Sequence, residues 1–225
     1  LERNIPIRWL LAIIGELGRL VMKIAMTQFS LWYKAGLKPG KLAMNLALKQ
    51  LKKDDFIDIL NDLIKETKCK AEWLELEVAE GQIMTSLEEA IKTLQQISDM
   101  GIELAVDDFG TGYSSLTYLK RLPINKLKID QAFIGDLPGD EEDAAITKVV
   151  IALAHSLNLK VIAEGVETKE QRDFLIENKC ESIQGYFYYK PVPGDEITKI
   201  LISELSWTIN DKWFTTRNDR KIKVN

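Results

Sequence analysis

The expected fold is decided by one stretch, IELAVDDFG at residues 102–110. Its first part, Ile102–Val106, is an apolar run of strand length that leads directly into Asp107 and Asp108. Gly110 follows at once and indicates that the strand ends there. Neighbouring residues of a regular strand point to opposite faces, so both aspartates can face one site only where the strand is ending. We therefore expect a strand that delivers two carboxylates to its carboxyl end.

Similar apolar runs alternate with segments of helical period from about residue 40 onward. A helix is expected around residues 56–66, and two more begin at predicted capping boxes, Ser86 with Glu89 and Thr168 with Gln171. No two strands are close enough for a hairpin, which predicts parallel strands joined by crossover helices. The expected strands are 42–46, 73–78, 102–106, 126–129, 160–163 and 182–186.

Polar residues collect at the carboxyl ends of these strands. A doubly wound open sheet usually has a glycine-rich phosphate loop after its first strand, and this chain has none there. A closed barrel, in contrast, places functional residues at the carboxyl ends of several strands. The pattern therefore favours a barrel. The residues at or near strand ends are Asn45, Glu77, Asp107, Asp108, Lys128, Glu164 and Gln184.

Composition limits the function classes. The 225 residues are 46% hydrophobic and 28% charged with a net charge of -4, which is typical of a soluble globular domain and does not indicate DNA binding. The two cysteines, Cys69 and Cys180, form no metal-spaced pair and favour a reducing, cytoplasmic location. The apolar stretch near Trp9 is too short to span a membrane. Any membrane anchor would therefore belong to a larger parent protein.

The single histidine, His155, excludes most zinc sites and histidine-based triads, and we expect it to have a surface or packing role. Carboxylates must then carry any chemistry. A cluster of oxygen ligands suits hard ions such as Mg²⁺ or Mn²⁺, and an aspartate that bridges two ions is one way to build a hydrolytic site. Taken singly, several candidates have plainer interpretations. Glu80 and Glu167 could be solvated loop charges, Lys128 a surface lysine, and Gln184 a contact in the barrel floor.

The segment DDFGTGYSS at residues 107–115 resembles the central signature of the EAL-domain family of cyclic-di-GMP phosphodiesterases. Other segments resemble further family motifs in the family's order, and the resemblance covers about residues 15–200. These segments are Asn45-Leu46, LELEVAE at 74–80, LKID at 127–130, AEGVE at 163–167 and QGY at 184–186.

The resemblance implies an α/β fold, a TIM-like (β/α)8 barrel of the EAL type with one antiparallel strand, that cleaves cyclic-di-GMP to linear pGpG with two Mg²⁺ or Mn²⁺ ions. It also implies a homodimer and a parent protein with sensor or GGDEF domains, without DNA binding. By match, Asn45, Glu77 and Asp107 would hold one metal, and Asp107, Asp108 and Glu164 the other. Lys128 and Glu164 would be catalytic, with Lys128 orienting the attacking water. Substrate binding or loop support would come from Glu80, Asp130, Glu167 and Gln184, with Glu80 bracing the loop from Phe109 to Ser115.

The Glu-Ala-Leu strand that gives the family its name is absent. Ile7-Arg8-Trp9 resembles the end of that motif, but Asn4-Ile5-Pro6 occupies the place of its three name-giving residues. We expect a single domain, 1–225, whose first one or two strands are missing or compressed within 1–14 and whose residues 205–225 form a tail with a solvated basic end. Either this is a genuine deletion or a longer natural protein contains the strand, and the raw edges of an incomplete barrel favour the second explanation.

Three hypotheses on function remain open at this point. The first is an active phosphodiesterase. The second is an inactive EAL module that binds cyclic-di-GMP or a protein partner. The third is an unrelated metal-dependent barrel hydrolase. The first two differ at the missing glutamate.

Overall fold

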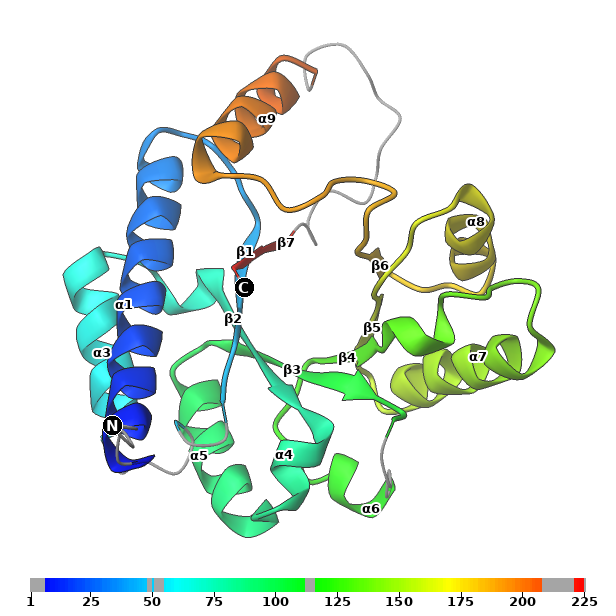
Figure 1. The fold of residues 1–225 in the computed structure, drawn as a ribbon, viewed down its shortest axis with the longest axis horizontal. Coiled ribbons are helices and arrows are strands. Elements are labelled where there is room, and N and C mark those ends of the chain that lie inside the picture. Colours follow the sequence, from blue (N-terminus) through cyan, green and yellow to red (C-terminus); the bar gives the residue numbers. More distant parts are fainter. Residues whose placement is uncertain (1–6, 48–49, 51–54, 112–115, 208–220, 225) are drawn as a thin grey trace, which may run out of the picture.

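A computed structural model describes residues 7–47, 50, 55–111, 116–207 and 221–224. Its centre is a curled sheet with the strand order β6-β5-β4-β3-β2-β1-β7, in which every pair of neighbours is parallel. Helices surround the outer side of this sheet (Figure 1). The strands are β1 Lys41–Asn45, β2 Leu74–Ala79, β3 Glu103–Phe109, β4 Lys126–Ile129, β5 Lys160–Ala163, β6 Ser182–Ile183 and β7 Lys221–Val224.

Helices connect the successive strands up to β6, as the alternating pattern predicts. The first helix, α1, begins at Ile7, so the described chain has no strand before β1. The α-helices are α1 Ile7–Lys34, α3 Phe56–Thr67, α4 Glu80–Met84, α5 Leu87–Asp99, α6 Leu116–Leu119, α7 Glu141–Ser156, α8 Lys169–Glu177 and α9 Gly194–Trp207. Two short 3-10 helices are η1 Ala71–Trp73 and η2 Gln131–Phe133.

The predicted barrel class is confirmed in the form of a half-barrel. All six predicted strands occur, although β6 is shorter and β3 is longer than expected. The sheet stays open, because β6 and β7 lie at its two ends and are not paired with each other. The antiparallel strand implied by the resemblance is not among the described strands. An open sheet agrees with the prediction that the first strands are missing or compressed.

The end of the chain corrects one expectation. Residues 221–224 were expected in a solvated basic end, but they form β7, and Ile222 is in register with Leu42 of β1. The edge of β1 offers a row of backbone N–H and C=O groups, and such groups are stabilised by pairing. Lys221-Ile222-Lys223-Val224 has the alternation that suits an edge strand.

The sheet has an apolar outer face and a charged inner face. On β2, Leu74, Leu76 and Val78 are buried in the hydrophobic core, whereas Glu75 and Glu77 alternate with them and point to the other side. The apolar face packs against helices, with contributions from Phe29 of α1, Leu63 of α3 and Ile97 of α5, none of which has exposed surface. Burial of such large apolar side chains is the main stabilising contribution to the fold.

Of the two predicted capping boxes, one is present. Thr168 accepts a hydrogen bond from the backbone of Gln171, and the Gln171 side chain accepts in return from the Thr168 backbone. Ser86 makes no such side-chain bond at the start of α5, so the second prediction is wrong. The reason is local: the backbone N–H of Ser86 is already bonded to Ile83 in the turn that ends α4, and this turn sets the Ser86 backbone.

Candidate active site

The carboxyl ends of four neighbouring strands bring charged side chains to one point inside the half-barrel. The Nζ atom of Lys128, on β4, lies 2.8 Å from Oε2 of Glu77, 2.7 Å from Oδ1 of Asp107 and 2.6 Å from Oε1 of Glu164. We call the set Glu77, Asp107, Asp108, Lys128 and Glu164 the mouth cluster. Lys128 has no exposed surface, so its interpretation as a surface lysine is wrong.

Lys128 is held in its charged form. Burial alone would lower the pKa of this ammonium, but the negative charges of Glu77, Glu164 and Asp107 outweigh that effect and raise the pKa above its ordinary value. Lys128 is therefore a permanent positive charge and hydrogen-bond donor at neutral pH. It can orient a water molecule or a phosphate oxygen, but it is unsuited to accept a proton.

A β-bulge brings the two adjacent aspartates to the same site. The strand does not end before them, as the sequence suggested, because β3 continues through both to Phe109. Instead, the pairing of β3 with β4 shifts register between Val106 and Phe109, and Asp108 has a left-handed backbone with φ 55°. Aspartate tolerates this conformation better than most residues, at a cost of roughly 1–2 kcal/mol. Bulges of this kind re-aim side chains beside active sites.

The bulge produces a group of three carboxylates that suits a metal ion. Carboxylate oxygens of Asp107, Asp108 and Glu164 all lie within 4.8 Å of one another. The pKa of Asp108 is raised, through partial burial and through the charges of Asp107, Asp130 and Glu164. With Glu77, the mouth cluster holds four carboxylates, of which three contact the ammonium of Lys128, so carboxylates outnumber the ammonium. Oxygen ligands in this arrangement fit Mg²⁺ or Mn²⁺.

Glu80 is buried, with 2% of its surface exposed, and is not a solvated loop charge. Its Oε2 atom accepts a 3.2 Å hydrogen bond from the backbone of Gly110, and its Oε1 atom accepts from the hydroxyl of Tyr118 on α6. Glu80 therefore fastens both ends of the loop after β3, whose residues 112–115 lie outside the described chain. Sequence reasoning missed Tyr118, since a lone tyrosine after a loop looks like an ordinary core residue.

Two glycines allow the loop after β5 to pack closely against the loops after β4 and β6, beside Glu164. Gly165 has φ +71°, and a Cβ atom there would lie 2.5 Å from Cβ of Gln131. A Cβ atom on Gly185 would lie 2.1 Å from the carbonyl oxygen of Val166. The close approach allows the backbone of Val166 to donate a 3.1 Å hydrogen bond to the carbonyl of Gln184. Gln184 is thereby placed beside the Glu164 loop.

Three predicted site residues are less closely joined to the cluster. Asn45, the last residue of β1, is in register with Glu77 but is exposed. Asp130 interacts with Asp108, yet its Oδ1 atom also caps η2 by accepting from the backbone of Ala132 at 2.7 Å. Glu167 is exposed. His155 forms a half-exposed pair with Glu181, away from these residues, in agreement with its expected surface role.

Similarity to known proteins agrees with this fold. A family model described as the EAL domain matches residues 3–191, and the chain belongs to this family. No helix among the described residues is both long and apolar enough to cross a membrane.

Two curated relatives within this family are similar to the chain in sequence. It is 38% identical over 193 residues to the bifunctional diguanylate cyclase/cyclic di-GMP phosphodiesterase MucR of Pseudomonas aeruginosa, covering 86% of this chain and 28% of MucR. It is 39% identical over 180 residues to the cyclic di-GMP phosphodiesterase NbdA of the same organism, covering 80% of this chain and 23% of NbdA. The chain thus spans about a quarter of the length of these relatives.

Two solved structures have a similar fold. The MucR phosphodiesterase in complex with c-di-GMP has a TM-score of 0.80 and 38% identity, over 87% of this chain and 79% of that one. The EAL domain of Mycobacterium smegmatis DcpA has a TM-score of 0.79 and 36% identity, over 84% of this chain and 85% of that one.

Proposed function

We propose that this chain binds cyclic-di-GMP and hydrolyses one of its phosphodiester bonds to give linear pGpG, with the help of Mg²⁺ or Mn²⁺. The observation that carries the proposal is the group formed by Asp107, Asp108 and Glu164, with carboxylate oxygens within 4.8 Å of one another in an EAL-family half-barrel. The names of MucR and NbdA, which describe cyclic di-GMP phosphodiesterases, support the choice of substrate.

The residues present fit divalent cations. Asp107, Asp108 and Glu164 would hold one ion, and Asn45, Glu77 and Asp107 the other. Bound cations would neutralise the charge that develops on the phosphoryl oxygens. Lys128 contributes independently of them: its fixed, charged ammonium would orient the attacking water. Glu164 contacts that ammonium and would limit its direction.

The loops around the cluster would support the substrate and the ligands. Glu80 holds Gly110 and Tyr118, and so would restrict the backbone directly after Asp108. Gln184, Asp130 and Glu167 would bind substrate or support the loops around it. We also propose a homodimer in the cytoplasm, within a parent protein that carries sensor or GGDEF domains. The short span relative to the relatives supports additional domains.

A second candidate function is a module that binds cyclic-di-GMP, or a protein partner, without cleaving it. One observation favours it: Asn4-Ile5-Pro6 stands where the family has Glu-Ala-Leu, so a metal ligand of the family is lacking. In addition, Asn45 is exposed at the end of β1. The site with Asn45 would be the weaker of the two.

One experiment separates the candidates. The purified chain is incubated with cyclic-di-GMP and Mn²⁺ or Mg²⁺, the products are separated by chromatography, and nucleotide binding is measured in parallel by calorimetry. Asp107→Asn and a sample with chelator are the controls. Metal-dependent pGpG supports hydrolysis. If a folded and metal-loaded sample binds cyclic-di-GMP but forms no pGpG, the chain is a binding module. If the folded chain neither binds cyclic-di-GMP nor forms pGpG, then both hydrolysis and nucleotide binding are contradicted, and only a module that binds a protein partner remains.

A further inference from the structure

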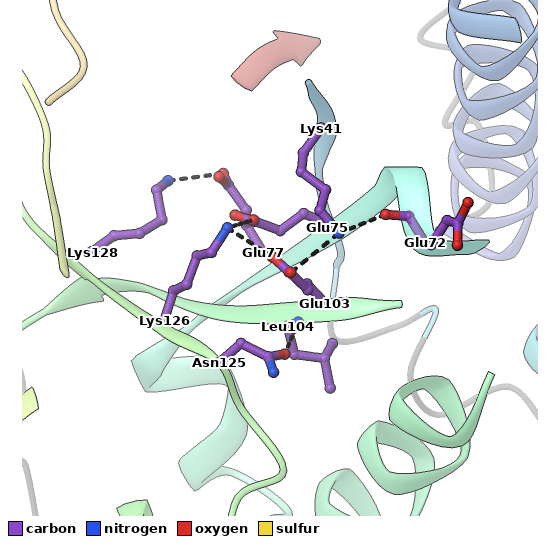
Figure 2. A network of polar contacts seen from close by, with 9 residues as sticks. All are labelled: Lys41, Glu72, Glu75, Glu77, Glu103, Leu104, Asn125, Lys126 and Lys128. Carbon is purple, nitrogen blue, oxygen red and sulfur yellow. Dashed lines mark hydrogen bonds and ion pairs between the residues drawn. The ribbon is translucent and has the colours of Figure 1, made fainter. Parts of the chain in front are cut away.

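A second charged cluster lies below the mouth cluster, toward the amino ends of β2, β3 and β4, the three strands that the two clusters share. The Nζ atom of Lys126 is 2.7 Å from Oε2 of Glu75 and 2.7 Å from Oε2 of Glu103, and Lys41 is 3.1 Å from the other oxygen of Glu103. Figure 2 shows these side chains converging from β1, β2, β3 and β4. We call Lys41, Glu75, Glu103 and Lys126 the floor cluster. Nothing in the proposed chemistry uses it.

Glu75 and Lys126 are the most deeply buried pair of this cluster. Glu75 has no exposed surface and Lys126 has 3%, whereas the side chains of Lys41 and Glu103 are 22% and 31% exposed. Burial alone would lower the pKa of Lys126, but the charges and hydrogen bonds of Glu75 and Glu103 outweigh it and raise the pKa, so the ammonium of Lys126 is charged at neutral pH. A buried ion pair of this kind gains little net stability over an apolar pair of similar volume. A role in stability alone therefore does not explain it.

The geometry suggests what the pair does. β2 and β4 are not neighbours, because β3 lies between them. Both lysines of β4 nevertheless reach β2, Lys126 to Glu75 and Lys128 to Glu77, one above the other (Figure 2). On β3, Ala105 is in register with both Lys126 and Glu77, and its side chain is only a methyl group. Two parallel links thus cross the inner face, two residues apart on each strand.

We infer that Glu75 and Lys126 are a positioning pair that fixes the distance between β2 and β4, and through it the contact between Glu77 and Lys128 in the mouth cluster. For turnover and metal binding this inference rests on the proposed function. In the mouth cluster, Lys128 contacts three carboxylates, and these attract its ammonium in different directions. The lower link is attached to the same two strands and leaves Lys128 one preferred position.

The test replaces the pair by apolar residues of similar volume, in Glu75→Leu with Lys126→Met. Such a replacement is expected to preserve folding, to be checked by circular dichroism and thermal unfolding. The affinity for Mn²⁺ should fall about tenfold or more, as it does when groups that orient metal ligands are removed. The kcat for cyclic-di-GMP should fall with KM little changed, since positioning affects the reaction step more than nucleotide binding.

A spectroscopic readout does not depend on metal or activity. The NMR signal of the Lys128 ζ-ammonium group, shielded from water by burial, should shift in the double variant. The matched control is Glu88→Leu with Arg121→Met, which removes a bidentate pair that is 69% and 49% exposed. The control should change neither the Lys128 signal nor the Mn²⁺ affinity.

A folded double variant with an unshifted Lys128 signal and wild-type Mn²⁺ affinity would overturn the inference. If the double variant does not fold, Glu75→Asp decides, because it keeps the charge and shortens the arm by one carbon: positioning predicts a shifted Lys128 signal, and a purely structural role predicts none. A wild-type chain that makes no pGpG, or binds no Mn²⁺, counts against the proposed function. In that case, the NMR signal of Lys128 still tests whether Glu75 and Lys126 position it.

Discussion

The mouth cluster and the floor cluster lie one above the other on β2, β3 and β4, but their charges are balanced differently. In the floor cluster, two lysines face two glutamates. In the mouth cluster, four carboxylates face one lysine. A balanced buried cluster satisfies its own charges, whereas an unbalanced one carries a penalty that an external cation relieves. The difference in charge balance indicates that the mouth cluster needs a cation and the floor cluster does not. Mutations can test this comparison.

The largest expected effect is that of Asp107→Asn. Asp107 is the one aspartate that contacts Lys128 and also belongs to the group of three carboxylates. If it bridges two ions, its loss weakens both, and turnover should be abolished. Asp108→Asn should weaken chiefly one ion and keep nucleotide binding while turnover falls steeply. Counting bound Mn²⁺ by mass spectrometry during a titration checks both variants, and a normal ion count in Asp107→Asn would place the bridge elsewhere.

The next effect compares Lys126→Met with Lys128→Met. Each removes the ammonium from a buried cluster, and breaking a buried pair costs about 3–5 kcal/mol of unfolding free energy. Without metal, both variants should lose stability of this order in urea. Added Mn²⁺ should restore much of the loss in Lys128→Met, since a cation can replace the ammonium among the carboxylates. It should not do so in Lys126→Met. Equal restoration in the two variants would contradict the comparison.

The clusters should also respond oppositely to pH. Burial alone would raise the pKa of Glu103, but Lys126 and Lys41 outweigh it and lower the pKa. Its contribution to stability is therefore present above its ordinary value, near 4.5, and is lost as the pH falls through the folded value. Asp108 has a raised pKa, so its contribution is present below its ordinary value of 3.8 and is lost as the pH rises.

Two variants check these signs. Glu103→Gln should flatten the loss of stability on acidification below about pH 4.5. Asp108→Asn should raise the urea midpoint of the metal-free chain at pH 7, because it removes a charge that its neighbours repel. Urea unfolding at a series of pH values, in the presence of chelator, measures both. A lower midpoint in metal-free Asp108→Asn would show that the mouth cluster is not under electrostatic strain.

The smallest effect is expected for Arg121→Ala. Arg121 makes a bidentate contact with Glu88 as close as those of the floor cluster, at 2.7 and 2.9 Å, but both side chains are half exposed or more. Solvent and side-chain entropy reduce the value of such pairs to about 0–1 kcal/mol. A loss in the urea experiment as large as that of Lys126→Met would mean that burial is not what separates the two kinds of pair.

Much of the fold could be predicted from sequence because alternation and helical period are local signals. The strand LELEVA shows why the inner face is charged, since its leucines and glutamates alternate. The same alternation could have identified Glu75 and Lys126, each two residues before a site residue, but a charge without a known motif gave no reason to choose them. β7 also has an alternating pattern, but its two lysines led to the prediction of a solvated end instead of a strand.

Other features depend on contacts that no local pattern records. The bulge at Asp108 follows from the register between β3 and β4, so the sequence predicted the meeting of the two aspartates but gave the wrong cause. The failed cap at Ser86 depends on the preceding turn of α4. The site roles came from resemblance to a family, and the structure adds their distances: it joins Glu77, Asp107, Asp108, Lys128 and Glu164 and leaves Asn45 and Glu167 exposed.

The pairing of β7 with β1 has a consequence for the order of folding. It joins Leu42 to Ile222, two residues that are far apart in the sequence, so it closes a very long loop. Contacts with such high sequence separation are formed late because their closure entropy must be offset first by the rest of the structure. The edge of β1 therefore stays open during synthesis and the early steps of folding. In that interval the nascent domain is open to strand exchange with another copy, a hazard that ends when β7 docks.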